Sequence, residues 1–350
     1  MLQAISWTGH GVRLLDQTRL PLETVYVEIA DERGMWEAIR RLVVRGAPAI
    51  GVAAAFGVYL GVRDAVGDSQ AILRRVEEVC QYLATSRPTA VNLFWALERI
   101  KGVARQAGDA RSIKRRLLDE ALEMIEEDNR VCRAIGEHGL RLLEPLSSPG
   151  REIGLLTHCN AGGLATVRYG TALAPIYVGA ERGLRFHVWA DETRPLLQGS
   201  RITAYELKEN GIPVTVICDG MAATVMRQGK VAAVIVGTDR VASNGDVANK
   251  IGTLGVAILA RHYSIPFFVA APTSSIDLTL ATGEQIPIEQ RPPEEIARGL
   301  GRQTVPEGVE IYNPAFDVTP NDLVTAFITE HGVARPPYVT SLGELCACDG

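Results

Sequence analysis

The alternation of apolar and helical segments after residue 150 limits the folds open to this chain more than any other feature. Five short runs rich in Val, Ile, Leu and Phe predict buried strands, at 153–156, 186–190, 214–218, 231–236 and 267–271. Helical patterns lie between most of them, at 164–173, 200–210, 220–228 and 250–262. Buried strands that alternate with helices are typical of a parallel, doubly wound, Rossmann-like sheet, so we expect an α/β fold.

The chain before residue 144 shows a different pattern. Short β-leaning segments, broken by Gly, Asp and Pro, predict a small antiparallel sheet from 4–7, 11–15 and 24–29. Apolar residues at three- and four-residue spacing then predict helices, at 31–43, 48–62, 70–85, 90–105 and 112–143. Because 144–150 is rich in Pro, Ser and Gly, we expect an N-terminal domain at 1–144 and a Rossmann-like domain at 151–350. Beyond Thr273 we expect short strands and a late helix near 321–330.

Charge and cysteine content argue against several kinds of partner. The net charge is −5 and the basic residues are scattered, so we expect no nucleic-acid surface. Six cysteines are few for 350 residues and no secretory signal precedes them, which favours a reduced cytoplasm. The uncharged stretch 46–62 contains a proline and four glycines and is barely long enough to cross a membrane, so we interpret it as a buried helix.

The segment 155–166, LLTHCNAGGLAT, contains the first candidate site. A buried strand runs into a polar cluster, two glycines and a predicted helix start, and ligands bind at such carboxyl ends of parallel strands. Free cysteines are commonly buried as small apolar side chains. We interpret three of them in this way, Cys80, Cys132 and Cys218. Cys159 differs because it ends a strand at the ligand-binding edge, which favours a functional role. Its neighbour His158 is expected to point into the core.

A second polar loop, 191–200, follows the predicted strand 186–190 at the same edge. Gln198 in this loop is suited to hydrogen-bond a hydroxyl-rich ligand, while Ser200 is a candidate helix N-cap. Asp191 and Arg194 are candidates for an ion pair that shapes the loop.

Asp239 follows the strand 231–236 and is placed to face the same pocket as Cys159. The alternatives are an ion pair with Arg240 or a turn cap. Asn249 and Lys250 then precede the next predicted helix, where a cation opposes the helix dipole unless it meets a bound phosphate.

Two arginines precede helices of the first half. Arg45 stands before Gly46 and Ala47, where a helix start with unpaired N–H groups would suit a phosphate. The alternative is an ordinary helix start with the arginine in solvent. Arg87 lies beside a Pro turn, and taken alone this indicates a surface arginine.

Several common motifs are absent from the sequence. There is no Walker A loop, no Gly-rich dinucleotide fingerprint, no HExxH and no spaced Cys/His set for zinc. The missing fingerprint argues against a nicotinamide dehydrogenase. Cys346 and Cys348 are expected in a frayed terminus.

Taken together, six motifs resemble the 5-methylthioribose-1-phosphate isomerase family of methionine salvage, and the resemblance runs from about residue 10 to about residue 330. They are RGAPAIG (45–51), RPTAVNL (87–93), THCNAGGLAT (157–166), ADETRPLLQGSRITAYEL (190–207), VIVGTDRVASNGDVANKIGT (234–253) and AAPTSSID (270–277). The fold is shared with the regulatory subunits of the exchange factor for translation initiation factor two. The resemblance implies a cytoplasmic homodimer that binds a small sugar 1-phosphate and serves methionine biosynthesis.

The family converts an aldose 1-phosphate to a ketose 1-phosphate without a metal or nicotinamide. The resemblance implies that Cys159 and Asp239 are the catalytic pair. It implies substrate binding by Arg45, Gly46, Ala47, Arg87, Gln198, Asn249 and Lys250. Because the phosphate ester prevents free ring opening, we hypothesise that an apolar pocket keeps Asp239 protonated to serve as acid at the ring oxygen. Cys159 then either shuttles a proton from C2 to C1 or stabilises a direct hydride shift.

Three alternatives remain open at this point. A ribose 1,5-bisphosphate isomerase would need extra basic residues for its second phosphate. A 5-deoxyribose 1-phosphate isomerase would differ only at a small apolar C5 substituent, which a hydrophobic pocket discriminates weakly. A non-catalytic scaffold subunit would share the fold without needing the catalytic set.

Overall fold

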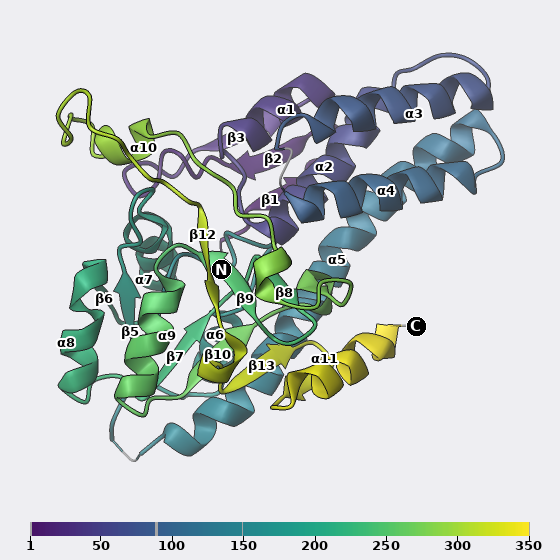
Figure 1. Cartoon of the computed structure of the whole chain (residues 1–350). Helices are drawn as coiled ribbons and strands as arrows, with labels where there is room; N and C mark the ends of the chain where they lie inside the picture. Colours follow the sequence, from purple (N-terminus) through teal and green to yellow (C-terminus); the bar gives the residue numbers. More distant parts are fainter. Residues whose placement is uncertain (1, 88–89, 149, 350) are drawn as a thin grey trace. The chain divides into compact units, whose positions relative to one another are not determined.

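The computed structural model describes residues 2–87, 90–148 and 150–349 (Figure 1). By their internal contacts the residues form two compact units. Unit 1 comprises Met1–Arg130 and Gly163–Arg168, and unit 2 comprises Val131–Gly162 and Tyr169–Gly350. The division falls inside helix α5 (Ala110–Leu143), ahead of the expected boundary at 144–151, because the carboxyl-terminal part of α5 packs in the core of unit 2.

Unit 1 begins with the antiparallel sheet that the sequence predicts. Its strands pair in chain order as β1 (Ile5–Trp7), β2 (Val12–Leu15) and β3 (Tyr26–Ile29). The predicted helices follow as α1 (Glu32–Arg40), α2 (Ala47–Val62), α3 (Ser69–Ala84), α4 (Val91–Arg105) and the first part of α5. Aspartates set two of these starts, since the carboxylates of Asp31 and Asp68 accept hydrogen bonds from first-turn N–H groups.

Helix α2 confirms the interpretation of the uncharged stretch as a buried helix. It contacts α1, α3 and α4, and every residue from Ala49 to Val58 is buried. Because protein surrounds it, the helix needs no polar stripe. Among the described residues, no helix is long and apolar enough to cross a bilayer.

Unit 2 is built on a seven-stranded sheet with the order β14–β13–β10–β7–β4–β5–β6. Its strands are β4 (Ile153–Thr157), β5 (Phe186–Asp191), β6 (Val214–Ile217), β7 (Ala233–Val236), β10 (Phe267–Ala270), β13 (Ala326–Thr329) and β14 (Gly332–Ala334). All neighbours are parallel except β14, which pairs antiparallel with β13 at the edge.

Helices cover both faces of this sheet (Figure 1). Residues of α5 and α6 (Ala174–Glu181) pack in one core cluster. Residues of α8 (Ala222–Arg227) and α9 (Thr253–His262) pack in the other. Neighbouring residues of β4 belong to opposite clusters, Leu155 to the first and Leu156 to the second. The Rossmann-like, doubly wound prediction is therefore confirmed.

The chain enters this sheet at its middle. From β4 it proceeds to β5 and β6 on one side, and it then returns to form β7, β10 and β13 on the other. In doubly wound sheets, ligands bind outside the carboxyl ends of the strands where the order reverses. That place here is between the loops that follow β4 and β7.

A second sheet of unit 2 was not expected from the sequence. Its order is β11 (Ile276–Asp277), β8 (Arg240–Ala242), β9 (Val247–Lys250) and β12 (Phe316–Thr319). Lys250 therefore ends a strand, and α9 begins only at Thr253, later than the predicted helix at 250–262. The antiparallel pairing of β9 with β12, more than sixty residues away in sequence, holds this segment extended.

Two predicted helices are wrong. Residues 164–173 form turns, and α6 begins only at Ala174. Main-chain groups of these turns form hydrogen bonds other than those of a helix, since the Leu164 carbonyl accepts from Gln17 Nε2. Residues 321–330 contain β13, whose apolar run pairs with β10. Near the end of the chain, α11 (Tyr338–Cys346) includes Cys346, and Cys348 lies in the short helical turn η7 (Ala347–Asp349).

Candidate active site

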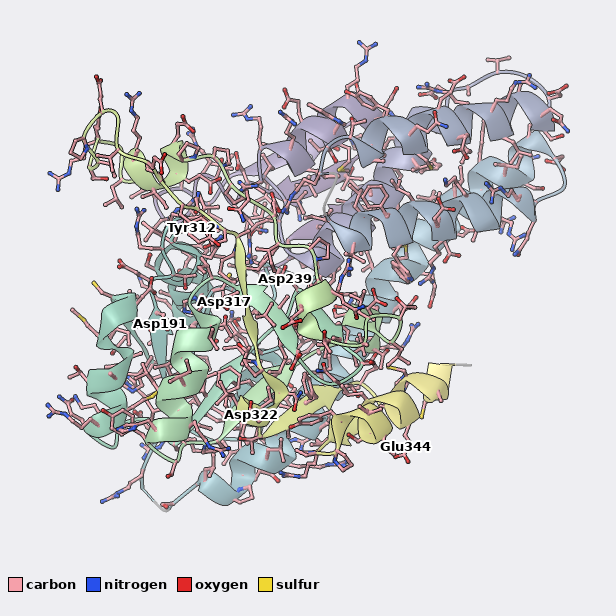
Figure 2. All side chains as sticks on the ribbon, in the orientation of Figure 1. Asp191, Asp239, Tyr312, Asp317, Asp322 and Glu344 are labelled. Atoms are coloured by element: carbon pink, nitrogen blue, oxygen red, sulfur yellow. The ribbon has the colours of Figure 1, made fainter. Side chains whose placement is uncertain are left out.

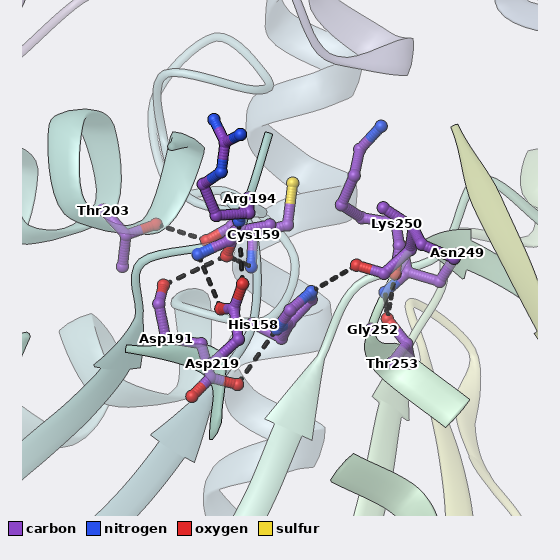
Figure 3. Close-up of polar contacts among 12 residues, drawn as sticks. His158, Cys159, Asp191, Arg194, Thr203, Asp219, Asn249, Lys250, Gly252 and Thr253 are labelled. Atoms are coloured by element: carbon purple, nitrogen blue, oxygen red, sulfur yellow. Dashed lines mark hydrogen bonds and ion pairs between the residues drawn. The ribbon is translucent and has the colours of Figure 1, made fainter. Parts of the chain in front are cut away.

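Cys159 and Asp239 lie at the strand-order reversal of unit 2. Asp239 comes three residues after β7 (Figure 2), and Cys159 comes two residues after β4 (Figure 3). Both follow the carboxyl ends of neighbouring parallel strands, paired through Leu155 with Ala233 and Leu156 with Val234. The two loops approach closely, because a Cβ at Gly237 would lie 2.5 Å from the Ala161 Cβ. The fold thus brings the predicted thiol and carboxylate to one sheet edge.

The main chain of Cys159 is strained and tightly held. Its φ is +63°, a left-handed conformation that costs a non-glycine residue about 1–2 kcal/mol. Its N–H donates to Thr193 Oγ1 at 2.8 Å, and its carbonyl accepts from Thr203 Oγ1 at 2.7 Å (Figure 3). The side chain of Asn160 also donates to Thr203 and to the buried carboxylate of Glu206. Such strain persists only where the surroundings fix it, and it is found preferentially at functional positions.

His158 is buried, as expected from its position beside Cys159. Its Nδ1 lies 2.9 Å from Asp191 Oδ2 and its Nε2 lies 2.8 Å from the Ile251 carbonyl. Burial lowers the pKa of His158, but the hydrogen bond and charge of Asp191 outweigh it, so the net shift is upward. Burial also raises the pKa of Asp191.

The predicted ion pair of Asp191 with Arg194 is wrong. Asp191 is turned to His158, and Arg194 donates to the carbonyls of Pro195 and Ile296. The loop is shaped instead by Asp219, whose two oxygens each accept a hydrogen bond at 2.8 Å from the N–H groups of Thr193 and Arg194. The sequence offered no signal for this long-range contact.

Gln198 is placed as a ligand-binding residue would be. It is buried, and its Oε1 has no hydrogen-bond partner among the described residues. A buried amide oxygen without a donor is costly, so a ligand hydroxyl would stabilise it. Ser200 is not a helix cap, because its hydroxyl lies inside the helical turn η2 (Gly199–Thr203) and donates to the Leu197 carbonyl.

The segment around Asp239 is fixed by the second sheet. The Asp239 N–H donates to the Ala248 carbonyl, and Arg240 forms its ion pair with Asp277 at 3.6 Å. Asn249 is buried and donates to Thr253 Oγ1. Lys250 Nζ donates to the Ala315 carbonyl at 2.9 Å and lies 4.6 Å from the Phe316 ring centroid.

Asp317 is a residue that the sequence analysis missed. From β12 it accepts hydrogen bonds from the N–H groups of Gly252 at 2.7 Å and Leu254 at 3.2 Å, at the start of α9. Burial raises the pKa of this carboxyl, against the effect of the two N–H groups. The start of α9 therefore already has an anionic partner.

The predicted phosphate-binding residues of the first half lie in unit 1. Arg45 Nε donates to the side chain of Gln17 at 3.1 Å. Gly46 has a φ of +94° and a Cβ there would collide with the main chain of Ala165, so the position requires glycine. Ala47 opens α2, which has no side-chain cap from Gly46. Arg87 is half-buried, while Pro88 and Thr89 of its motif lie outside the described residues.

Among the described residues, His158, Asp191 and Asp219 are near enough for a cation, with ligand atoms within 4.8 Å of one another. The imidazole nitrogens and the Asp219 oxygens are already used in the hydrogen bonds given above. The observed geometry is therefore that of a hydrogen-bonded cluster.

The fold and this site define a class, a doubly wound α/β protein with a strained thiol and a carboxylate at the strand-order reversal. Residues 43–336 match the Initiation factor 2 subunit family, and the chain belongs to this family.

Its relatives include named isomerases. The methylthioribose-1-phosphate isomerase of Symbiobacterium thermophilum is 56% identical, over 98% of this chain and 95% of its own. The 5-deoxyribose 1-phosphate isomerase of Moorella thermoacetica is also 56% identical, over 98% of this chain and 97% of its own. These relatives confirm the family resemblance, and the chain is an isomerase by this kinship.

Two solved structures share the whole fold. The 5-methylthioribose 1-phosphate isomerase of Pyrococcus horikoshii OT3 has a TM-score of 0.92 and 42% identity, covering 99% of this chain and 96% of that one. The translation initiation factor eIF-2B, subunit delta, of A. fulgidus has a TM-score of 0.89 and 42% identity, covering 99% of this chain and 100% of that one.

Proposed function

We propose that this isomerase converts 5-methylthioribose 1-phosphate to 5-methylthioribulose 1-phosphate in methionine salvage. The proposal rests on one observation above all, that a strained Cys159 and Asp239 follow neighbouring strands at the sheet's order reversal. Relatives at 56% identity with isomerase names support the substrate class.

In this proposal Asp239 is the acid that protonates the ring oxygen as the sugar opens. Cys159 assists the transfer of hydrogen from C2 to C1, either as a proton carrier or by stabilising a hydride shift. The reaction needs no net oxidation, because C2 is oxidised as C1 is reduced. The proton that the C2 hydroxyl loses as the ketone forms balances the proton given to the ring oxygen. Solvent deuterium at C1 of the product supports the proton route, and complete transfer of a C2 label to C1 supports the hydride route.

Substrate binding is proposed for seven residues. Gln198 supplies a buried oxygen for a sugar hydroxyl, and Asn249 and Lys250 lie at the end of β9. Phosphate binding is proposed for Arg45, Gly46, Ala47 and Arg87. We further propose a cytoplasmic homodimer that acts without metal or cofactor.

A second candidate is 5-deoxyribose 1-phosphate, the substrate in the name of an equally similar relative. The two sugars differ at the C5 substituent alone. A hydrophobic pocket separates such substrates by about 1–3 kcal/mol for a methylene-sized difference.

Turnover of three sugar phosphates tests the proposal: methylthioribose 1-phosphate, 5-deoxyribose 1-phosphate and ribose 1,5-bisphosphate. They are assayed side by side without added metal, with and without EDTA. We expect EDTA-resistant activity that is highest on methylthioribose 1-phosphate. Preference for the bisphosphate, or no turnover by the folded protein as expected of a scaffold subunit, would contradict the proposal.

Asp239→Asn and Cys159→Ser test the catalytic pair. Each is expected to lower kcat by about 10²–10⁴-fold with little change in KM, because Asp239→Asn removes the proposed acid and Cys159→Ser removes the thiol that assists hydrogen transfer on either route. The matched controls are Asp322→Asn and Cys348→Ser, at exposed positions, which should retain full activity. An active Asp239→Asn variant would refute the acid role.

A further inference from the structure

The cluster of buried groups beside Cys159 contains a titratable pair that the proposed chemistry does not use. We propose that His158 and Asp191 share one proton at neutral overall charge, and that this pair is a positioning device. It fixes the position of the turn at Cys159 relative to the turn formed by Lys250–Gly252. The inference deepens the proposed function and rests on it for the role of Cys159.

The hydrogen-bond partners of His158 determine where the protons of the pair lie. A carbonyl can only accept, so the contact of His158 Nε2 with the Ile251 carbonyl at 2.8 Å requires a proton on Nε2. The contact of Nδ1 with Asp191 Oδ2 at 2.9 Å then needs one further proton, on either atom. An imidazolium with a carboxylate and a neutral imidazole with a carboxylic acid both give the pair zero net charge.

The surroundings hold the pair in this state. His158 and Asp191 side chains are 1% and 0% exposed, so adding or removing a proton would bury an uncompensated charge. Among the described residues, the charged groups outside the pair with the largest effects on it are carboxylates: Asp219 after β6, Asp317 on β12 and Glu192 beside Asp191. They disfavour the loss of the shared proton. The upward pKa shifts of both partners agree with this arrangement.

The pair links three segments that meet at the proposed site. His158 is the residue before Cys159 at the end of β4, and Asp191 ends β5 (Figure 3). The Ile251 carbonyl belongs to the turn between Lys250 and Gly252. Gly252 has a φ of +106°, and a Cβ there would lie 2.7 Å from His158 Cε1, so the imidazole is packed directly against this turn. Movement of the ring would therefore displace Cys159 relative to Lys250.

Two substitutions of Asp191 distinguish a role in positioning His158 from a need for the carboxylate itself. In Asp191→Asn the amide N–H₂ can donate to Nδ1 of a neutral His158, which keeps both hydrogen bonds and zero charge. We expect this variant to retain kcat within about three-fold of the parent. Asp191→Ala removes the partner, and we expect kcat to fall roughly 10–100-fold with KM less affected, because a small misplacement of a reacting group is that costly. Val188→Ala, at a buried core position three residues before Asp191 on the same strand, is the control for lost packing and should keep the parent kcat.

Nitrogen NMR of ¹⁵N-histidine-labelled protein gives a second measurement that does not depend on activity. The His158 signal is assigned by its loss in His158→Gln. We expect an Nε2-bound proton in both the parent and Asp191→Asn, and no titration of this ring between pH 6 and 9. Titration near the ordinary histidine pKa of about 6.5 would overturn proton sharing. An Asp191→Ala variant with the parent kcat, or an Asp191→Asn variant as impaired as Asp191→Ala, would overturn the positioning role. If the protein turns over none of the sugars, the NMR result still decides the first claim.

Discussion

Two helices of this protein start in the same way and differ in what their starts can bind. α2 and α9 each begin after a glycine of positive φ, +94° at Gly46 and +106° at Gly252. Each has a cation just before it in sequence, Arg45 or Lys250. At α9 the carboxylate of Asp317 accepts from two N–H groups, whereas Gly46 provides no side-chain cap for α2.

The difference shows that a local sequence signal for anion binding is not sufficient. The N–H groups at a helix start attract an anion, but a carboxylate of the protein can satisfy them as well as a phosphate can. We therefore infer that the start of α2 contributes more to phosphate binding than the start of α9. Lys250 makes its own contacts with Ala315 and Phe316, so its loss should matter less than that of Arg45.

Among the changes that test this comparison of helix starts, the largest expected effect is at the two cations. Arg45→Ala should raise KM for the sugar phosphate by roughly 30–100-fold, because a charged partner of the phosphate is removed. Lys250→Ala should raise KM by less than about ten-fold. Steady-state kinetics measures both, with Arg41→Ala at an exposed position of unit 1 as control. A larger rise of KM in Lys250→Ala than in Arg45→Ala would contradict the inference that the start of α2 contributes more to phosphate binding.

Gly252→Ala should be the next most damaging change. It places a Cβ at a left-handed φ and against the imidazole of His158. We expect the free energy of unfolding to fall by about 2 kcal/mol, measured by chemical denaturation. Gly255→Ala, within α9 where a Cβ meets nothing within 4 Å, should instead raise it by about 0.5–1 kcal/mol. Equal stability of the two variants would show that the turn tolerates a side chain.

Removal of the α9 cap tests whether Asp317 serves stability. Asp317→Ala leaves the N–H groups of Gly252 and Leu254 without their acceptor, so unfolding should become easier by about 1–2 kcal/mol. Asp317→Asn keeps one acceptor oxygen and should lose less. If KM for the sugar phosphate falls in Asp317→Ala, the start of α9 binds phosphate once it is vacated, and the two helix starts are equivalent after all.

The smallest expected effect is a dependence of stability on pH. Burial raises the folded-state pKa of Asp317 above the ordinary 3.8, so the folded protein binds this proton more readily than the unfolded chain does. The ionised carboxylate therefore costs stability at neutral pH, and this cost disappears as pH falls through the raised pKa. Thermal melts of parent and Asp317→Asn from about pH 7 to pH 4 should show the parent gaining relative to the variant. A difference in thermal stability between parent and Asp317→Asn that does not change with pH would contradict an upward shift of the Asp317 pKa.

The fold was predictable where the pattern is local and repeated. The β4, β5, β6, β7 and β10 segments were each recognisable as apolar runs, and the helices of unit 1 by their periodicity. The second sheet was not predictable, because β9 and β12 are short and depend on one another across more than sixty residues. The turns at 164–173 were mistaken for a helix because apolar spacing alone does not reveal where the main-chain groups bond.

The candidate site, too, was predictable from the sequence only in part. The positions of Cys159 and Asp239 at strand ends follow from the order of apolar runs, and the resemblance of six motifs is the source of the roles proposed for them. The contacts of His158 with Asp191, of Asp219 with the loop after β5, and of Asp317 with α9 could not be read from the sequence. Each joins groups from different strands.

The sequence by itself determined the doubly wound sheet, the family and the thiol and carboxylate at its central strands, because periodicity and short motifs are properties of neighbouring residues. Only the tertiary structure decided which buried groups share protons and which helix start is already capped. Those properties depend on burial and on distances of about 3 Å between atoms far apart in the chain, which residue spacing does not specify.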